Sequence, residues 1–153
     1  MQIGLYLTIN LCTMKPIVPV SQIMSKNVIK LNIDDSLTKA EALFKEHNIR
    51  HIPVLSGSEI VGIISYTDLL KVSLADYSDD DTEVTTTLYN MFSLKQVMTK
   101  DVTTVLSYTS IKEVAEIFAS SDFRALPVTY ENKLVGIVTT TDIIKYLLEY
   151  YER

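Results

Sequence analysis

The sequence predicts an α/β (α+β) fold in which two β-α-β-β-α units pack as a pseudo-twofold pair. The first observation is an internal repeat: residues 24–71 align with residues 98–145 without a gap, at an offset of 74 positions, and 14 of the 48 aligned pairs are identical. The second is that each copy alternates short apolar runs with segments that are apolar at helical spacing. Because two copies are too few for a solenoid, we expect the repeat to pack on itself, with a cleft between the halves as a natural ligand site.

A strand followed by a helix opens each copy. Residues 28–31 form an apolar run typical of a buried strand. Ser36 is placed to cap the helix that follows, and the S-x-x-E sequence beginning at Ser110 has the spacing of a capping box in the second copy. Asn48 and Asp122 tolerate a left-handed backbone conformation, so we expect them to close the two helices.

Two strands and a second helix complete each copy. In the first copy we expect the strands over residues 51–55 and 60–65, and the helix from residue 66 toward Leu74. The second copy repeats these elements over residues 125–129, 134–139 and 140–150.

The composition narrows the classes of function. With 153 residues, 47% of them hydrophobic and 22% charged, the chain can bury a core. Its net charge of −5 argues against nucleic-acid binding, because phosphate contacts need a basic face. A single cysteine, Cys12, excludes an internal disulfide and a zinc cluster and fits a reducing cytoplasm. His47 and His51 are the only histidines, so we expect no metal site.

Four segments are expected along the chain. Residues 20–75 and 94–153 hold the two units, and the acidic, polar stretch over residues 76–93 is expected to be a solvated linker. Residues 1–19 form an arm that packs on a partner or include a translation-start artefact, with Met14 opening the natural chain. The apolar start lacks the features of a secretory signal and is too short to span a bilayer, so no membrane partner is expected.

A polar segment follows the second strand pair of each copy, where the last strand gives way to a helix. Residues 62–68 read G-I-I-S-Y-T-D and residues 136–142 read G-I-V-T-T-T-D, so that Ser65 or Thr139 stands three positions before an aspartate. Free N–H groups at a helix start favour an anion, and a carboxylate can accept from two adjacent sugar hydroxyls. One interpretation is therefore a ribose with its phosphate; the alternative is that these sequences only cap their helices.

An arginine stands just before a strand in each unit. Arg50 in I-R-H-I-P-V and Arg124 in F-R-A-L-P-V could neutralise phosphates, or each could pair with an acidic surface side chain. His51 has no counterpart in the second copy, and a lone histidine is not expected to be catalytic. Pro53 and Pro127 imply edge positions or strand starts, where a missing N–H is tolerated.

These motifs resemble two cystathionine-β-synthase (CBS) domains in tandem. The resemblance rests on M-S-K-N-V, R-H-I-P-V and G-I-I-S-Y-T-D in the first copy, with M-T-K-D-V, R-A-L-P-V and G-I-V-T-T-T-D in the second, and it covers residues 20–150. It implies a Bateman module, in which two CBS units pack through their strands and leave two equivalent clefts. Such modules commonly bind AMP, ADP or ATP, some bind S-adenosylmethionine or a related ligand, and they often pair into homodimers through their helices.

The resemblance also implies residue roles. Asp68 and Asp142 would hold the ribose. The phosphate would be contacted by hydroxyl and basic side chains: Ser65, Thr67, Thr139, Thr141, Arg50, His51 and Arg124. The adenine pocket would consist of Ser25, Thr99, Ile52, Pro53, Leu126 and Pro127. Ala125 in place of His51 makes the clefts unequal, and the first has more cations nearby if each arginine serves its own unit.

The expected function is a regulatory module that binds adenosine nucleotides between two CBS domains and acts as an energy or metabolite sensor for an unidentified partner protein. The sequence holds no nucleophile–base pair, metal cluster or P-loop, so no enzyme is expected and no cofactor is required. The alternatives are a ligand-free dimerisation or interaction scaffold, or a binder of S-adenosylmethionine or a related ligand. A homodimer is expected because the last helix is apolar on more than one face.

Overall fold

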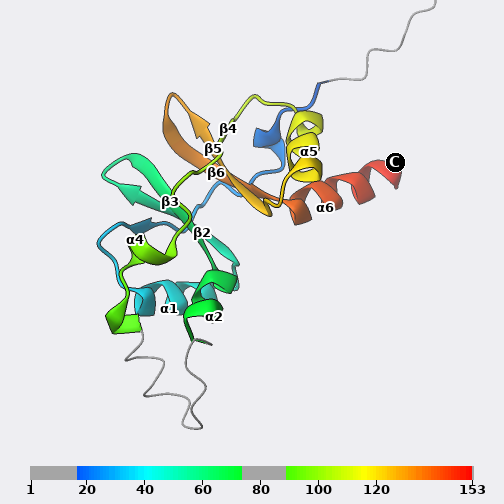
Figure 1. Ribbon diagram of the computed structural model, residues 1–153. Helices are drawn as coiled ribbons and strands as arrows, with labels where there is room; N and C mark the ends of the chain where they lie inside the picture. The colour runs from blue at the N-terminus through cyan, green and yellow to red at the C-terminus, as the bar shows by residue number, and fades with distance from the viewer. Residues whose placement is uncertain (1–16, 74–88, 153) are drawn as a thin grey trace, which may run out of the picture.

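The computed structural model describes residues 17–73 and 89–152, and Figure 1 shows them in two lobes, each with a small sheet and helices beside it. The first lobe contains β1 (Leu31–Asn32), α1 (Leu37–His47), β2 (His51–Ser56), β3 (Glu59–Ser65) and α2 (Tyr66–Ser73). The second lobe contains β4 (Val105–Leu106), α5 (Ile111–Ser120), β5 (Ala125–Tyr130), β6 (Lys133–Thr139) and α6 (Thr140–Tyr151). Two short helices, η1 (Val20–Gln22) and α4 (Leu94–Val97), precede the copies. Residues 1–16 of the expected arm over residues 1–19 and most of the expected linker lie outside the described residues.

Both sheets have the same topology and register. In each, the central strand runs parallel to the short first strand and antiparallel to the third, in the orders β1-β2-β3 and β4-β5-β6. Val54 faces Gly62 in one sheet and Val128 faces Gly136 in the other, and a register shift follows each valine. The repeat in the sequence is therefore a repeat of backbone structure, and the predicted β-α-β-β-α order is confirmed.

The first strand of each unit is shorter than the sequence predicted. β1 begins only at Leu31 and has two residues, whereas a strand was expected over residues 28–31. Val28 and Ile29 lie ahead of β1, outside any strand, and line a cavity described below. Their side chains therefore line the cavity without belonging to a sheet, and Ile29 also packs against the first core.

The prolines stand in the central strands, so the expectation of an edge position or a strand start is wrong. Pro53 pairs with Ile63 of β3, and β1 reaches only Val54 and Leu55. The Ile63 N–H and carbonyl bond to Thr99 and not to Pro53, at 3.0 and 2.9 Å. No ladder hydrogen bond is therefore lost at the proline, which explains its tolerance in a central strand.

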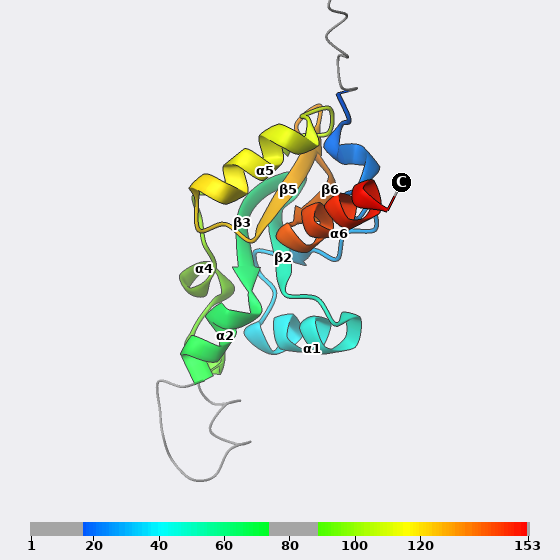
Figure 2. The ribbon, with the colours of Figure 1, turned by 90° about the vertical axis from the view of Figure 1, so that its right-hand side faces the viewer.

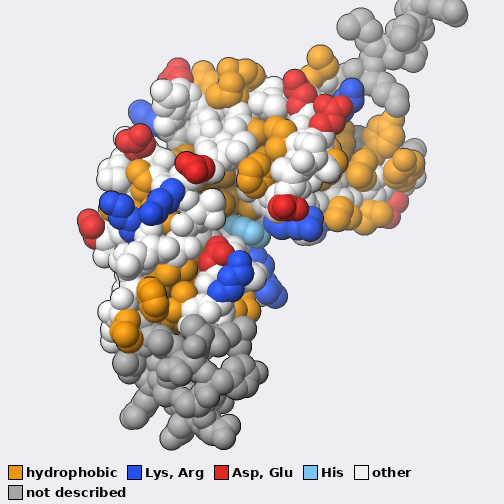
Figure 3. All heavy atoms as spheres, viewed as in Figure 1, with side chains coloured by type: hydrophobic (Ala, Val, Ile, Leu, Met, Phe, Trp, Pro, Cys, Tyr) orange, Lys and Arg blue, Asp and Glu red, His pale blue; other side chains and the backbone are white. Residues whose placement is uncertain are grey.

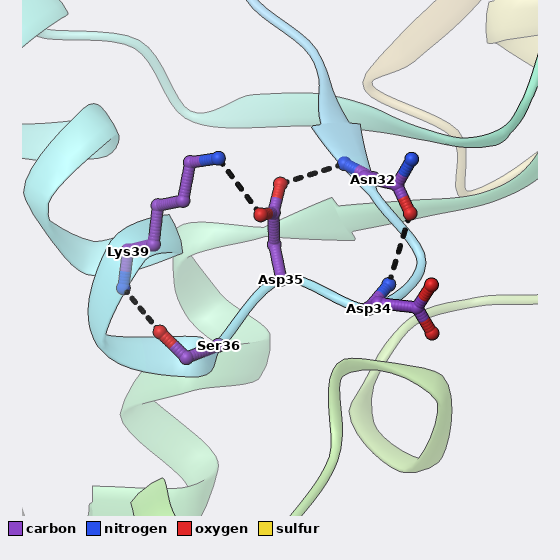
Figure 4. A network of polar contacts seen from close by, with 5 residues as sticks. All are labelled: Asn32, Asp34, Asp35, Ser36 and Lys39. Carbon is purple, nitrogen blue, oxygen red and sulfur yellow. Dashed lines mark hydrogen bonds and ion pairs between the residues drawn. The ribbon is translucent and has the colours of Figure 1, made fainter.

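The helix starts follow the sequence prediction closely. At α1, the Ser36 Oγ accepts from the Lys39 N–H at 3.1 Å, and the Asp35 carboxylate accepts from the Asn32 N–H at 2.7 Å and from the Lys39 Nζ at 2.8 Å (Figure 4). At α5, Ser110 and Glu113 form the predicted capping box. These bonds satisfy N–H groups that the first turn of a helix leaves free, so they fix where each helix begins.

Only one of the two predicted left-handed helix ends is present. Asn48 closes α1 with a φ of 50°, as predicted. α5 instead ends at Ser120, followed by Ser121 in an extended conformation, so the prediction for Asp122 is wrong. The hydroxyls of Ser120 and Ser121 donate to carbonyls of the last turn, at 2.8 Å to Glu116 and 2.7 Å to Ile117, which satisfies acceptors that a left-handed cap would otherwise serve.

The segment that leads into each copy packs in the lobe of the other copy. Val20 of η1 is fully buried in the second core, and its N–H donates to the Thr109 carbonyl at 2.8 Å. Leu94 and Met98, at the two ends of the α4 segment, are buried in the first core together with Tyr89. Figures 1 and 2 show η1 beside α5 and α6, and α4 beside α2. This exchange ties the two lobes together and was not predicted from the sequence. Within the described residues, no helix is long and apolar enough to cross a membrane.

Candidate functional site

Two related cavities lie between the lobes, and each combines residues of both units. We name them by their aspartates: the Asp142 cleft has a volume of about 530 Å³ and the Asp68 cleft about 470 Å³. Polar side chains of the Asp142 cleft are Ser25, Asn27, Asn48, Arg50, His51, Arg124, Thr139, Thr140, Thr141, Asp142 and Lys145. Those of the Asp68 cleft are Thr99, Asp101, Thr103, Asp122, Arg50, His51, Arg124, Ser65, Thr67, Asp68 and Lys71. Figure 3 shows basic, acidic and histidine side chains gathered at the waist between the lobes.

Backbone bridges place the leading segments at these clefts. Ser25 exchanges two hydrogen bonds with Ile137 of β6, at 2.9 and 3.0 Å, and Thr99 exchanges two with Ile63 of β3, at 2.9 and 3.0 Å. Each bridge joins the leading segment of one unit to the last strand of the other. Ser25 and Thr99 therefore line the Asp142 and Asp68 clefts respectively, where the sequence placed them in a pocket.

A methionine crosses a glycine beside each bridge. A Cβ at Gly62 would overlap the side chain of Met98, and a Cβ at Gly136 would overlap that of Met24. Glycine is therefore required because a side chain from the other unit lies directly over the strand. Both the methionine and the glycine are identical in the two copies, so the repeat marked them. Their contact could not be predicted, because the two residues lie far apart in the sequence.

Each aspartate caps the helix that begins at its cleft. The Oδ2 of Asp142 accepts from the N–H and Oγ1 of Thr139 at 2.7 and 2.8 Å, and the Oδ2 of Asp68 accepts from the N–H and Oγ of Ser65 at 2.9 and 2.6 Å. The capping interpretation of the S/T-x-x-D sequences is thus confirmed. It leaves Oδ1 of each carboxylate with capacity to accept from a ligand, apart from the Lys71 Nζ at 3.7 Å from Asp68.

The capping hydrogen bonds determine which hydroxyls in the clefts can donate to a ligand. The Ser65 and Thr139 hydroxyls donate to their own aspartates, so in this arrangement they can accept from a ligand but have no proton left to donate. In the described part of the chain, the hydroxyls of Thr67 and Thr141 make no hydrogen bond, and both are exposed in the clefts. They are the better donors to a phosphate.

Both arginines border both clefts, so the arginines do not give one cleft more cations than the other. Arg50 lies over the ring of Tyr66, with its guanidinium carbon 5.6 Å from the ring centroid, and Tyr66 packs edge-on against Phe44. The position equivalent to Tyr66 is Thr140, which offers Arg124 no ring. Among the described residues neither arginine forms an ion pair with a carboxylate, which leaves both guanidinium groups available to an anion.

His51 is half-buried at the start of β2 and reaches both clefts. Burial lowers the pKa of His51 below its usual value, and the nearby Asp68 charge opposes this only in part. The ring is therefore neutral at neutral pH. It serves the clefts as a hydrogen-bonding group and not as a fixed cation.

Only some residues of the predicted adenine pocket line a cleft. Ile52 is fully buried in the first core, Pro53 and Pro127 are buried in the central strands, and these three residues line neither cleft. Leu126 does line the Asp68 cleft. The apolar lining that the sequence missed comes mainly from residues ahead of the first strand and ahead of the central strand, namely Val28, Ile29 and Ile49 in one cleft and Val102 and Phe123 in the other.

Comparison with known proteins places these features in a family. The CBS domain model matches residues 20–75 and 94–149. A 17.7 kDa protein from the bps2 3′ region of Acidianus ambivalens is 33% identical over 132 residues, which cover 85% of this chain and 73% of that protein. MJ1225 of Methanocaldococcus jannaschii is 29% identical over 126 residues, 80% of this chain and 45% of that protein, and its crystal structure gives a TM-score of 0.72. The chain thus spans less than half the length of MJ1225.

A similar crystal structure that contains ligands gives a further comparison. It is the CBS domain pair of protein MJ0100 in complex with 5′-methylthioadenosine and S-adenosyl-L-methionine. That pair is 28% identical to this chain, with a TM-score of 0.74, and the match covers 88% of this chain and 99% of that chain. Since the family model matches both copies of the repeat, the chain belongs to the CBS domain family, as a tandem CBS pair.

Proposed function

We propose that this CBS pair is a regulatory module that binds an adenosine nucleotide, AMP, ADP or ATP, between its two units. The observation that carries the proposal is the pair of clefts, which share two arginines that form no ion pair within the described residues, and each of which has an exposed threonine hydroxyl and a carboxylate oxygen at a helix start. The similarity to the MJ0100 pair, whose complex holds two adenosine compounds, supports an adenosine ligand.

Each part of the nucleotide has a matching group in the Asp142 cleft. Oδ1 of Asp142 is an acceptor suited to the ribose hydroxyls, and the hydroxyl of Thr141 can donate to phosphate oxygens. Arg50 and Arg124 can each bind phosphate through two parallel hydrogen bonds. Ile29 and Ile49 supply apolar surface for the adenine ring. The Asp68 cleft offers the equivalent aspartate, threonine and arginines, with Phe123 at the position of Ile49 and Thr103 at the position of Ile29.

Regulation follows from the way the clefts are built. Because each cleft takes one wall from each unit, a ligand contacts both lobes at once and favours the relative arrangement in which the walls fit it. A ligand shifts a conformational equilibrium only through such differential contacts. We infer that a partner protein, which this sequence does not identify, responds to that arrangement, in the cytoplasm as the cysteine content favours.

We also propose that the module is a homodimer that pairs through α6. The exposed apolar side chains of this helix are Ile144, Leu147, Leu148, Tyr150 and Tyr151, and Ile143 alone faces the core as a buried residue. Figure 1 shows α6 projecting from the second lobe, and an exposed apolar surface of this kind is typical of an interface. Light scattering at micromolar concentration is expected to give twice the chain mass of 17.3 kDa. A result at the chain mass itself would remove the dimer from the proposal.

Thermal unfolding with and without AMP, ATP and S-adenosylmethionine tests the ligand. A ligand at a hundredfold excess over its Kd stabilises the native state by about 2.7 kcal/mol. Asp142→Ala and Asp68→Ala are expected to weaken binding in their own clefts by roughly tenfold to a hundredfold, because each removes hydrogen bonds to a charged acceptor.

A matched control separates lost binding from lost stability. Glu113→Ala removes a capping carboxylate with nearly the same geometry, which accepts from the N–H and Oγ of Ser110 at 2.9 and 2.6 Å but lines neither cleft. It should lower the melting temperature to a similar degree and leave ligand affinity unchanged. If none of the three ligands stabilises the wild-type protein, the scaffold alternative replaces nucleotide binding.

A further inference from the structure

The two clefts are related by the repeat, so their walls can be compared position by position. Most polar positions match, including the aspartates, the arginines, and the lysines Lys145 and Lys71. Two positions differ in charge alone: Asn27 corresponds to Asp101, and Asn48 corresponds to Asp122. All four residues line their clefts, so the Asp68 cleft carries two carboxylates where the Asp142 cleft carries two amides of the same shape.

These replacements change the charge balance of the clefts. The Asp142 cleft has three cationic side chains, Arg50, Arg124 and Lys145, against one carboxylate. The Asp68 cleft has the same arginines and Lys71 against three carboxylates. With His51 neutral, the Asp142 cleft is formally positive and the Asp68 cleft has no net charge.

The lysines reinforce this difference. The Lys71 Nζ lies 3.7 Å from Oδ1 of Asp68, so its charge is partly neutralised by its own cleft. Within the described residues, Lys145 forms no ion pair and stands free at the Asp142 cleft. A phosphate in the Asp142 cleft therefore meets three cations that have no carboxylate partner.

We propose that the clefts divide adenosine ligands by charge: the Asp142 cleft takes the phosphorylated nucleotide, and the Asp68 cleft takes an adenosine compound without phosphate, neutral or cationic. The proposal rests on the proposed function and assigns a ligand class to each of its sites. Two exposed carboxylates facing a phosphate dianion reduce its affinity by roughly tenfold at low ionic strength, and salt screens the effect because the groups are exposed.

Calorimetric titration of the full chain with ATP, AMP and adenosine tests this division. We expect the wild-type protein to bind one ATP per chain with high affinity, and Asp142→Ala to weaken that step by roughly tenfold to a hundredfold while adenosine still binds in the Asp68 cleft. The double variant Asp101→Asn with Asp122→Asn gives the Asp68 cleft the two amides of the Asp142 cleft. It should raise the ATP affinity of the Asp68 cleft about tenfold, so that a second ATP binds per chain. The double variant Asn27→Asp with Asn48→Asp should lower the ATP affinity of the Asp142 cleft by the same factor and change adenosine affinity little.

The control variant makes the same change of charge away from the clefts. Asp34→Asn with Glu131→Gln removes two carboxylates that line neither cleft, so ATP stoichiometry should stay at one. Two equal ATP sites in the wild-type protein, or no response of ATP binding to either cleft pair, would overturn the division by charge while leaving nucleotide binding intact. If no adenosine compound binds or stabilises the wild-type protein at all, the proposed function fails, and the division fails with it.

Discussion

The first and second CBS units follow the same backbone path, yet they differ in how their shared residues are held. Arg50 is stacked on Tyr66, whereas its equivalent Arg124 has a threonine at the matching position. Met98 is only 7% exposed over Gly62, whereas Met24 is partly exposed over Gly136. Identical residues thus set the framework in both units, and the differences lie in the side chains that surround them.

The largest effect is expected from the arginines that both units share. Arg50→Ala with Arg124→Ala removes two guanidinium groups that border both clefts, and each charge-assisted contact is worth about 1.5–3 kcal/mol. The double variant should therefore weaken ATP and AMP by at least a hundredfold, weaken uncharged adenosine far less, and flatten the salt dependence of binding. Titrations in low and high salt measure both quantities.

The single variants sharpen the comparison between the arginines. Tyr66 already orders Arg50, so Arg50 loses less side-chain freedom on binding than Arg124 does, and Arg50→Ala should cost more affinity than Arg124→Ala. Equal losses for adenosine and ATP would show that the arginines maintain the fold and do not contact phosphate.

A smaller effect is expected from the paired glycines. Gly62→Ala introduces a methyl group against Met98, which is enclosed by the first core, and such overpacking costs about 1–3 kcal/mol of unfolding free energy. Gly136→Ala should cost less, because Met24 is partly exposed and can move aside. Urea unfolding of both variants measures the difference.

Replacing the methionine tests whether its contact with the glycine causes this loss of stability. In the double variant Gly62→Ala with Met98→Ala, the cost should be clearly smaller than the sum of the two single variants, since the added methyl group fills part of the space left by the methionine. Additive costs, or a larger cost at Gly136, would mean that methionine packing does not distinguish the units.

How far the sequence predicted these features depends on the distance over which each is determined. The caps at Ser36 and Ser110 and the left-handed Asn48 are set by neighbours within four residues, and all three were predicted correctly. The exchange that buries Val20 and Leu94 in opposite lobes depends on contacts far along the chain, which hydrophobic periodicity does not specify.

The clefts were predicted in part for the same reason. Their aspartates and arginines are marked by the repeat, and the structure does bring them together. The repeat could not predict which residues share a cleft, because each cleft is lined by residues of both units. The contrast between Asn27 and Asp101 was visible in the sequence, but it acquired meaning only once both residues were placed at equivalent sites.

The smallest effect is expected at His51, the cleft residue that the second unit replaces with alanine. Because burial lowers the pKa of His51 in the folded protein, the unfolded chain takes up a proton first as the pH falls through about 6.5, and the native state loses stability on that side. His51→Ala removes this term, so its unfolding free energy should fall less than that of the wild type between pH 7 and pH 5. The carboxylates titrate in both proteins, and the difference between the two profiles therefore isolates the histidine.

A bound phosphate favours the charged ring of His51, so ATP should bind the wild type more tightly at pH 5.5 than at pH 7.5, and this gain in affinity should be smaller in His51→Ala. Identical pH profiles for the two proteins would mean that His51 does not distinguish the units electrostatically.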